Sequence, residues 1–132
     1  MYPEVLDTYR KVNEQFFGNP SSLHRLGNEA DALLQQSRKQ IAQLLGAQPD
    51  EIFFTSGGTE SDNWAIKGTA MEKFATGKHL IASSVEHPAV SKSLEQLGKL
   101  GFEITYLPVD ADGIVSVEEL GKAIRKDTIL VS

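Results

Sequence analysis

Cysteine is absent from this 132-residue sequence, and its absence removes several kinds of chemistry at once. The chain can form no disulfide and no thiolate metal site, and it contains no cysteine nucleophile. Histidine is scarce as well, with residues only at positions 24, 79 and 87. No two of them have the short spacing that is typical of metal ligands, so we expect no metal site.

Basic charge and long apolar runs are also lacking. Lysine and arginine number 13 against 18 aspartates and glutamates, which gives a net charge of -5. Since nucleic-acid binding depends on clustered basic residues, this balance argues against a nucleic-acid partner. No apolar run approaches the roughly 20 residues of a membrane span, and the N-terminus has no signal-peptide pattern. We therefore expect a cytoplasmic protein without a membrane partner.

Helical periodicity and short apolar runs alternate along most of the chain. The sequence predicts four strands, over residues 51–55, 78–85, 102–109 and 128–131. Helices are predicted before and between them, over residues 4–16, 23–45, 59–76, 90–97 and 117–124. Strands that are joined by helical crossovers predict an α/β fold with a parallel sheet covered by helices on both faces.

The domain organisation follows from length and from the last predicted strand. The length suits one hydrophobic core, and no shift in composition marks an internal boundary. The sequence ends directly on the apolar run 128–131, which leaves nothing to cover that strand. We therefore expect residues 1–132 to be a single partial domain of a longer protein.

A glycine pair, Gly57 and Gly58, separates the first predicted strand from a polar segment that begins a helix. A strand, a tight turn and a helix N-terminus in this order expose backbone N–H groups, which commonly bind phosphate. The simpler interpretation is a plain connection in which Thr59 caps the helix and Asp62 completes a capping box. The spacings of P-loops and dinucleotide-binding turns are absent. The charges of Glu60 and Asp62 oppose a polyphosphate unless their side chains point away, so the turn favours a single phosphate group.

His87 has the clearest functional position among the histidines. It follows the second predicted strand and precedes Pro88, so its ring is expected near the carboxyl ends of the strands, where ligands of α/β sheets bind. It is either a stacking face or proton carrier there, or simply a residue of a surface loop. His79 opens a strand, away from that edge, and is expected to be structural. His24 is expected to be a helix cap or an anion contact.

Three sequence blocks together resemble the cysteine desulfurases, which are pyridoxal-phosphate enzymes of the class V aminotransferase superfamily. The blocks are Gly-Asn-Pro-Ser-Ser-Leu-His-Arg-Leu-Gly at 18–27, Phe-Thr-Ser-Gly-Gly-Thr-Glu-Ser-Asp-Asn at 54–63 and Glu-His-Pro-Ala-Val at 86–90. The resemblance covers essentially the whole chain. It implies the aspartate-aminotransferase-like fold (PLP fold type I), with residues 1–132 as the N-terminal part of its large domain.

The resemblance also implies roles for three residues. Gly58 and Thr59 match the pair that binds the phosphate of pyridoxal 5'-phosphate (PLP) in the family. His87 matches the histidine that stacks on the pyridine ring and takes part in proton transfer, which makes it the catalytic candidate. The family reaction converts L-cysteine to L-alanine and passes the sulfur to an enzyme persulfide, for iron–sulfur cluster or thio-nucleoside assembly. A homodimer and a sulfur-acceptor or scaffold protein are the implied partners.

Several family features have no counterpart in the sequence. They are the opening segment, the aspartate that pairs with the pyridine nitrogen, the Ser-x-x-His-Lys block with the Schiff-base lysine, and the cysteine loop. We therefore expect the isolated chain to be inactive and to bind the cofactor weakly at best. Two alternatives stay open. One is another class V enzyme, such as a selenocysteine lyase or an aminotransferase, and the other is a non-catalytic module that binds a phosphorylated ligand or a partner protein.

Overall fold

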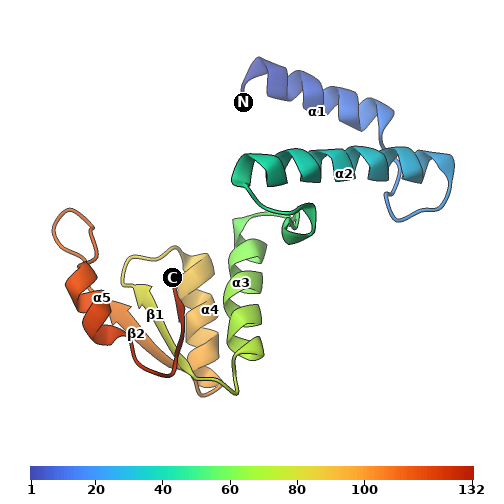
Figure 1. Ribbon diagram of the computed structural model, residues 1–132. Helices are drawn as coiled ribbons and strands as arrows, with labels where there is room; N and C mark the ends of the chain where they lie inside the picture. The colour runs from blue at the N-terminus through green and yellow to red at the C-terminus, as the bar shows by residue number, and fades with distance from the viewer. The chain divides into compact units, whose positions relative to one another are not determined.

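The computed structural model describes residues 1–132, which form two compact units, residues 1–54 and residues 55–132. The expectation that residues 1–132 are a single partial domain stays a prediction. Figure 1 shows the elements along the chain. They are α1 (Pro3–Gln15), α2 (Arg25–Leu45), the 3-10 helix η1 (Pro49–Glu51), α3 (Gly58–Glu72), β1 (His79–Ser83), α4 (Pro88–Lys99), β2 (Glu103–Leu107), α5 (Val117–Ala123) and β3 (Thr128–Val131).

The long helix α2 dominates the first unit. Its N-cap is His24, whose Nδ1 accepts a hydrogen bond from the backbone N–H of Gly27 at 3.3 Å. The C-cap of the helix is Gly46, which adopts the left-handed conformation that is common for glycine at this position, with φ of 67°. The predicted start at residue 23 was two residues too early. Ser21 and Ser22 belong to the preceding turn, where the side chain and carbonyl of Asn19 accept their N–H groups.

The predicted strand over residues 51–55 is wrong. Its first residue belongs to η1, and Ile52 is extended, with φ of -100° and ψ of 121°, but no strand pairs with it. Instead, Nη1 of Arg38 on α2 donates a hydrogen bond to the Ile52 carbonyl, and the guanidinium lies 5.0 Å from the centre of the Phe54 ring. An apolar run becomes a strand only where a neighbour completes its hydrogen-bond ladder, and all three strands lie in the other unit.

Residues 55–132 contain a three-stranded sheet in the order β2-β1-β3. Both outer strands pair with β1 in parallel, so that His79 lies opposite Glu103 on β2 and opposite Thr128 on β3. These strands correspond to the second, third and fourth strands of the prediction. Helices α3 and α4 lie side by side (Figure 1), and α5 contacts β2. The predicted α/β class, with a parallel sheet flanked by helices, is therefore confirmed.

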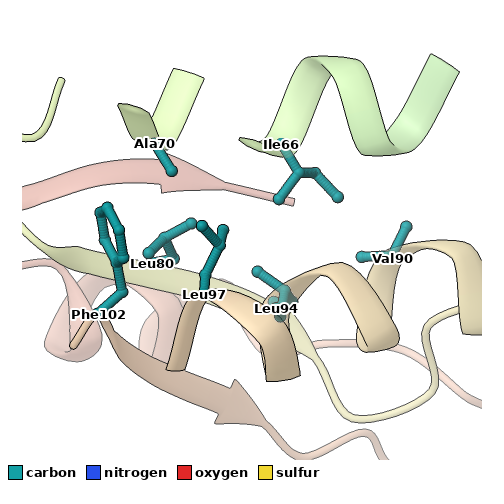
Figure 2. Close-up of a cluster of buried hydrophobic side chains, with 8 residues drawn as sticks. Ile66, Ala70, Leu80, Val90, Leu94, Leu97 and Phe102 are labelled. Carbon is teal, nitrogen blue, oxygen red and sulfur yellow. The ribbon is translucent and has the colours of Figure 1, made fainter. Parts of the chain in front are cut away.

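One hydrophobic core holds this unit together and includes side chains of α3, α4 and β1 (Figure 2). Its buried members are Ile66, Ala70, Leu80, Ala82, Val90, Leu94, Leu97 and Phe102. Leu94 and Leu97 lie about one turn apart on α4 and are fully buried, as is Leu80 of β1. Phe74 adds an edge-to-face contact with Phe102, with 5.6 Å between the ring centres. The core fixes α3 and α4 against the sheet and so positions the N-terminal ends of both helices within the unit.

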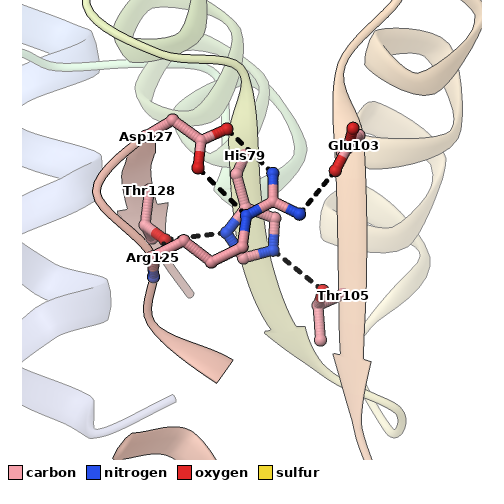
Figure 3. A network of polar contacts seen from close by, with 6 residues as sticks. All are labelled: His79, Glu103, Thr105, Arg125, Asp127 and Thr128. Atoms are coloured by element: carbon pink, nitrogen blue, oxygen red, sulfur yellow. Dashed lines mark hydrogen bonds and ion pairs between the residues drawn. The ribbon is translucent and has the colours of Figure 1, made fainter. Parts of the chain in front are cut away.

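His79 connects all three strands at their N-terminal ends (Figure 3). Its side chain is buried, and Nδ1 lies 2.7 Å from Oγ1 of Thr128 on β3, while Nε2 lies 2.8 Å from Oγ1 of Thr105 on β2. The two hydroxyls satisfy both ring nitrogens in either tautomer, because a hydroxyl both donates and accepts. This position agrees with the structural role that was predicted for His79.

The stability of the fold should depend on pH through His79. Burial of the imidazole and the nearby Arg125 guanidinium lower the pKa of His79 from its ordinary 6.5, while Asp127 and Glu103 act in the opposite direction. Near pH 6.5 the unfolded chain therefore binds, on average, more protons at this residue than the folded chain does. We expect the free energy of unfolding to fall as the pH drops from about 7 through 6.5 toward the lowered value of the folded state.

Urea denaturation at a series of pH values between about 7.5 and 5 measures this dependence. The matched control is His79→Asn, which removes the titrating group. Its free energy of unfolding should vary less across the same interval. An unchanged pH dependence in this variant would show that another group is responsible. Asp127 and Glu60 also have lowered pKa values. Because their ordinary values are 3.8 and 4.5, their contributions to the free energy of unfolding are lost only at more acidic pH.

Candidate active site

The N-terminus of α3 forms the first part of the candidate site. Gly57 is the N-cap and has φ of 157° and ψ of 179°, a conformation that is essentially restricted to glycine. The first hydrogen bond of the helix runs from the Ser61 N–H to the Gly57 carbonyl at 3.1 Å. The backbone N–H groups of residues 58–60 therefore have no acceptor within the helix, and they are available to an anion.

Thr59 does not cap the helix, and this prediction was wrong. The helix begins at Gly58, so Thr59 is its second residue, and no capping box with Asp62 forms. Thr59 is exposed; its carbonyl accepts a hydrogen bond from the Asn63 side chain at 2.8 Å, and its hydroxyl is left for a ligand. No other part of the chain lies within 4 Å of the place that a β-carbon on Gly58 would take. An open surface with unpaired N–H groups and a hydroxyl fits a single phosphate group.

Side chains on both sides of Gly57 hold the turn in place. Oε2 of Glu60 accepts two hydrogen bonds from Ser56, one from its N–H and one from its hydroxyl, each at 2.7 Å. The hydroxyls of Thr55 and Ser61 lie 2.6 Å apart, and they lie 3.2 and 3.3 Å from the Gly57 carbonyl. The two Ser56 donors lower the pKa of the Glu60 carboxyl. Sequence reasoning missed this network, although a serine and a glutamate flanking paired glycines were its signal.

His87 occupies a similar position at the start of α4. It is the N-cap of this helix, and its Nδ1 accepts a hydrogen bond from the Ala89 N–H at 3.1 Å. In the neutral ring the proton is then on Nε2. The residue is exposed, whereas the neighbouring Glu86 is turned back, with its Oε1 accepting a hydrogen bond from the Ser83 hydroxyl at 3.1 Å. The ring of His87 and its Nε2 are therefore open to a ligand.

The fold brings these two helix starts to one end of the unit. The C-terminal end of α3 connects to the N-terminal end of β1, and α4 follows the C-terminal end of β1. Both helices therefore begin near the C-terminal end of β1, and they lie side by side (Figure 1). Ligands of open α/β sheets bind at this end of the strands. Gly58, Thr59 and His87 therefore lie at the same end of the unit, whereas His79 lies at the opposite end of β1.

Two other polar side chains make contacts within their own segments. His24 belongs to residues 1–54, where it caps α2. Asp110 stabilises a turn, because its Oδ1 accepts hydrogen bonds from the N–H groups of Asp112 and Ile114, each at 2.9 Å. The structure contains no group of three histidine, aspartate or glutamate side chains that is suited to a metal ion. None of the helices combines the length and the apolar character that crossing a membrane requires.

Comparison with known proteins defines the class. The protein-family model described as aminotransferase class-V matches residues 1–132, so the chain belongs to the class-V aminotransferase family, whose enzymes use PLP. A NifS/IcsS protein homolog of Lactobacillus delbrueckii subsp. bulgaricus is 57% identical over 132 residues, which are 100% of this chain and 34% of that protein. Cysteine desulfurase IscS of Dictyoglomus turgidum is 53% identical over 98% of this chain and 33% of its own length. The chain thus spans about a third of the length of these relatives.

A solved structure supports the same assignment. The chain superimposes on a NifS-like protein with a TM-score of 0.92 at 38% identity, over 99% of this chain and 36% of the other. The fold is therefore that of the NifS-like enzymes of PLP fold type I. The resemblance to the cysteine desulfurases, which the three sequence blocks indicated, is confirmed.

Proposed function

We propose that residues 55–132 supply the phosphate-binding and ring-contacting part of a PLP-dependent cysteine desulfurase. The observation that carries this proposal is the N-terminus of α3, where the N–H groups of residues 58–60 and the Thr59 hydroxyl are open to an anion. The positive end of the helix dipole favours the dianionic phosphate of the cofactor at this place. The name of the Dictyoglomus relative, a cysteine desulfurase, supports L-cysteine as the substrate, and we propose L-alanine as the product.

Each candidate residue has a separate task in this proposal. The backbone N–H of Gly58 and the N–H and hydroxyl of Thr59 bind the phosphate and orient the cofactor. His87 stacks its ring on the pyridine ring. Because the Nδ1 of His87 is engaged by the Ala89 N–H, the atom that can hold or move a proton at the substrate is Nε2. The cofactor, when bound, supplies the electron sink for the chemistry at the amino acid.

Other groups have to complete the reaction. The sequence has no cysteine, so the thiol that accepts the sulfur comes from outside residues 1–132, and we propose the same for the Schiff-base lysine. The chain alone is then inactive and acts as a single partial domain. In the whole enzyme, a cytoplasmic homodimer, a persulfide passes sulfur to an acceptor or scaffold protein for iron–sulfur cluster or thio-nucleoside assembly. Another class V enzyme, such as a selenocysteine lyase, is the alternative at this site.

One titration experiment tests the proposal with two ligands, PLP and inorganic phosphate, followed by amide NMR of the chain. Thr59→Ala removes the hydroxyl but keeps the N–H, so we expect it to lower the affinity for both ligands about tenfold. His87→Asn removes the ring but keeps a good N-cap for α4. We expect this variant to lower the affinity for PLP about tenfold and to leave the affinity for phosphate unchanged.

Thr59→Ser is the control for the first substitution, since it retains a hydroxyl, and its affinities should stay within about threefold of the wild type. Unchanged phosphate affinity in Thr59→Ala would exclude Thr59 from the phosphate site. If His87→Asn bound both ligands as tightly as the wild type does, the ring of His87 would have no role in cofactor binding. A module that binds phosphate without catalysis would then be the better interpretation.

A further inference from the structure

The conformation of Gly57 needs support from its neighbours. Glycine adopts φ of 157° and ψ of 179° without strain, but it adopts other conformations as readily, so contacts from neighbouring residues have to fix this one. Contacts of this kind are present on both sides of the residue. Glu60 binds the preceding Ser56 through its N–H and hydroxyl, and the Thr55 and Ser61 hydroxyls lie beside the Gly57 carbonyl. The turn is therefore fixed before any ligand arrives.

We propose that Glu60 is a positioning residue of the phosphate site: its carboxylate holds Ser56, and this contact fixes Gly57 so that the N–H groups of residues 58–60 point to one place. This role rests on the proposed function, because it serves the same phosphate site. It concerns the side chain of Glu60, which has no task in the proposed function. Its effect on the ligand is indirect and acts through the backbone.

The charge of Glu60 has to be weighed against this role, because a carboxylate near an anion site repels the anion. Both hydrogen bonds from Ser56 favour the ionised carboxyl, and its pKa is lowered accordingly. Glu60 is therefore negatively charged at neutral pH. Its Oε2 is bound to the residue before Gly57, whereas the free N–H groups belong to the residues after it. The two Ser56 donors thus engage the carboxylate, and this pairing offsets part of its repulsion of an anion.

Positioning and repulsion have opposite effects on affinity, and two substitutions distinguish them. Glu60→Ala removes both the charge and the contact to Ser56. Glu60→Gln removes the charge but keeps a carbonyl oxygen that can accept the same two hydrogen bonds. If Glu60 positions the turn, Glu60→Ala weakens phosphate binding about tenfold, and Glu60→Gln stays within about threefold of the wild type. If repulsion dominates, both variants bind phosphate more tightly.

The probe is inorganic phosphate, titrated into the chain and followed by the amide NMR signals of residues 56–60. The matched control is Glu72→Gln, which removes the same charge from the last residue of α3 and should leave the affinity unchanged. Amide exchange in the core residues Leu80 and Leu94 shows that each variant is folded. Without ligand, the Ser56 N–H should exchange faster in Glu60→Ala than in Glu60→Gln, because only the alanine variant loses its acceptor.

The outcomes separate this inference from the proposed function. Tighter phosphate binding in Glu60→Ala, or equal losses in both variants, would overturn the positioning role while the phosphate site itself stands. Unchanged affinity in Glu60→Ala would overturn it as well. A wild-type chain that binds neither phosphate nor PLP would overturn the proposed function, and the positioning role with it.

Discussion

His79→Ala is expected to lower the free energy of unfolding of residues 55–132 by about 2–4 kcal/mol. The substitution leaves a cavity at a fully buried position and removes the partner of a hydroxyl on each neighbouring strand. Thr128 keeps a second contact, because its Oγ1 also accepts the Arg125 N–H at 2.7 Å, so most of the polar loss falls on Thr105. Urea denaturation near pH 7.5 measures the effect under conditions in which the histidine is neutral in both states.

A double-mutant cycle with Thr105→Val gives this prediction its control. The valine variant removes the hydroxyl that contacts Nε2 while it keeps the shape of the side chain approximately. If the contact between His79 and Thr105 stabilises the fold, the two substitutions together cost less than the sum of their separate effects. Strictly additive effects would show that His79 acts through its volume alone. Both outcomes are measurable, because the single effects are expected to be well above the experimental error.

The strands of the sheet could be predicted from the sequence because their signals are local. Each of the three is a short apolar run between turn residues, and each forms next to strands that are themselves part of the chain. The run at residues 51–55 has the same local signal but no neighbouring strand, and Arg38 takes up one of its carbonyls instead. Strand formation depends on a distant partner, which a local pattern does not contain.

Histidine roles were harder to predict in detail. The position of His79 at the start of a strand indicated a structural residue, but its partners Thr105 and Thr128 lie 26 and 49 residues away in the sequence. His24 and His87 are both N-caps, a position at which serine, threonine, aspartate and asparagine are the usual residues. A cap was considered for His24 and was correct. For His87 a stacking face, a proton carrier and a surface-loop residue were considered but a cap was not, and the structure shows that Nδ1 accepts the Ala89 N–H.

The phosphate turn shows a similar limit. The turn at the paired glycines and the helix that follows it were predicted from local patterns. The class of enzyme was predicted from three blocks of sequence. The role of Glu60 could not be inferred in the same way. Charge alone suggests that it opposes an anion, whereas the structure turns its carboxylate toward Ser56 and makes it part of the turn. The direction of a long side chain depends on the donors that surround it in three dimensions, so the local sequence pattern does not determine it.

Gly57→Ala is expected to be the most damaging single substitution at the candidate site, and Gly58→Ala the mildest. A side chain at φ of 157° and ψ of 179° costs about 1–3 kcal/mol, or forces the turn into another conformation. The N–H groups of residues 58–60 would then no longer converge, so we expect phosphate affinity to fall at least tenfold, roughly the effect of losing one charge-assisted hydrogen bond. Denaturation and phosphate titration of the same variant measure both effects.

Gly58→Ala is the matched control, because the same methyl group is added one residue later. Gly58 has no positive φ, lies at the first position of α3 and has no other part of the chain within 4 Å of its β-carbon position. Alanine restricts the unfolded chain more than glycine does, so stability should stay the same or rise by a few tenths of a kcal/mol. The N–H that binds phosphate is retained, and affinity should change less than about threefold.

Equal losses in both variants would mean that phosphate binding depends on open space at the glycine pair. Losses confined to Gly57→Ala would mean that it depends on the backbone conformation at this one residue.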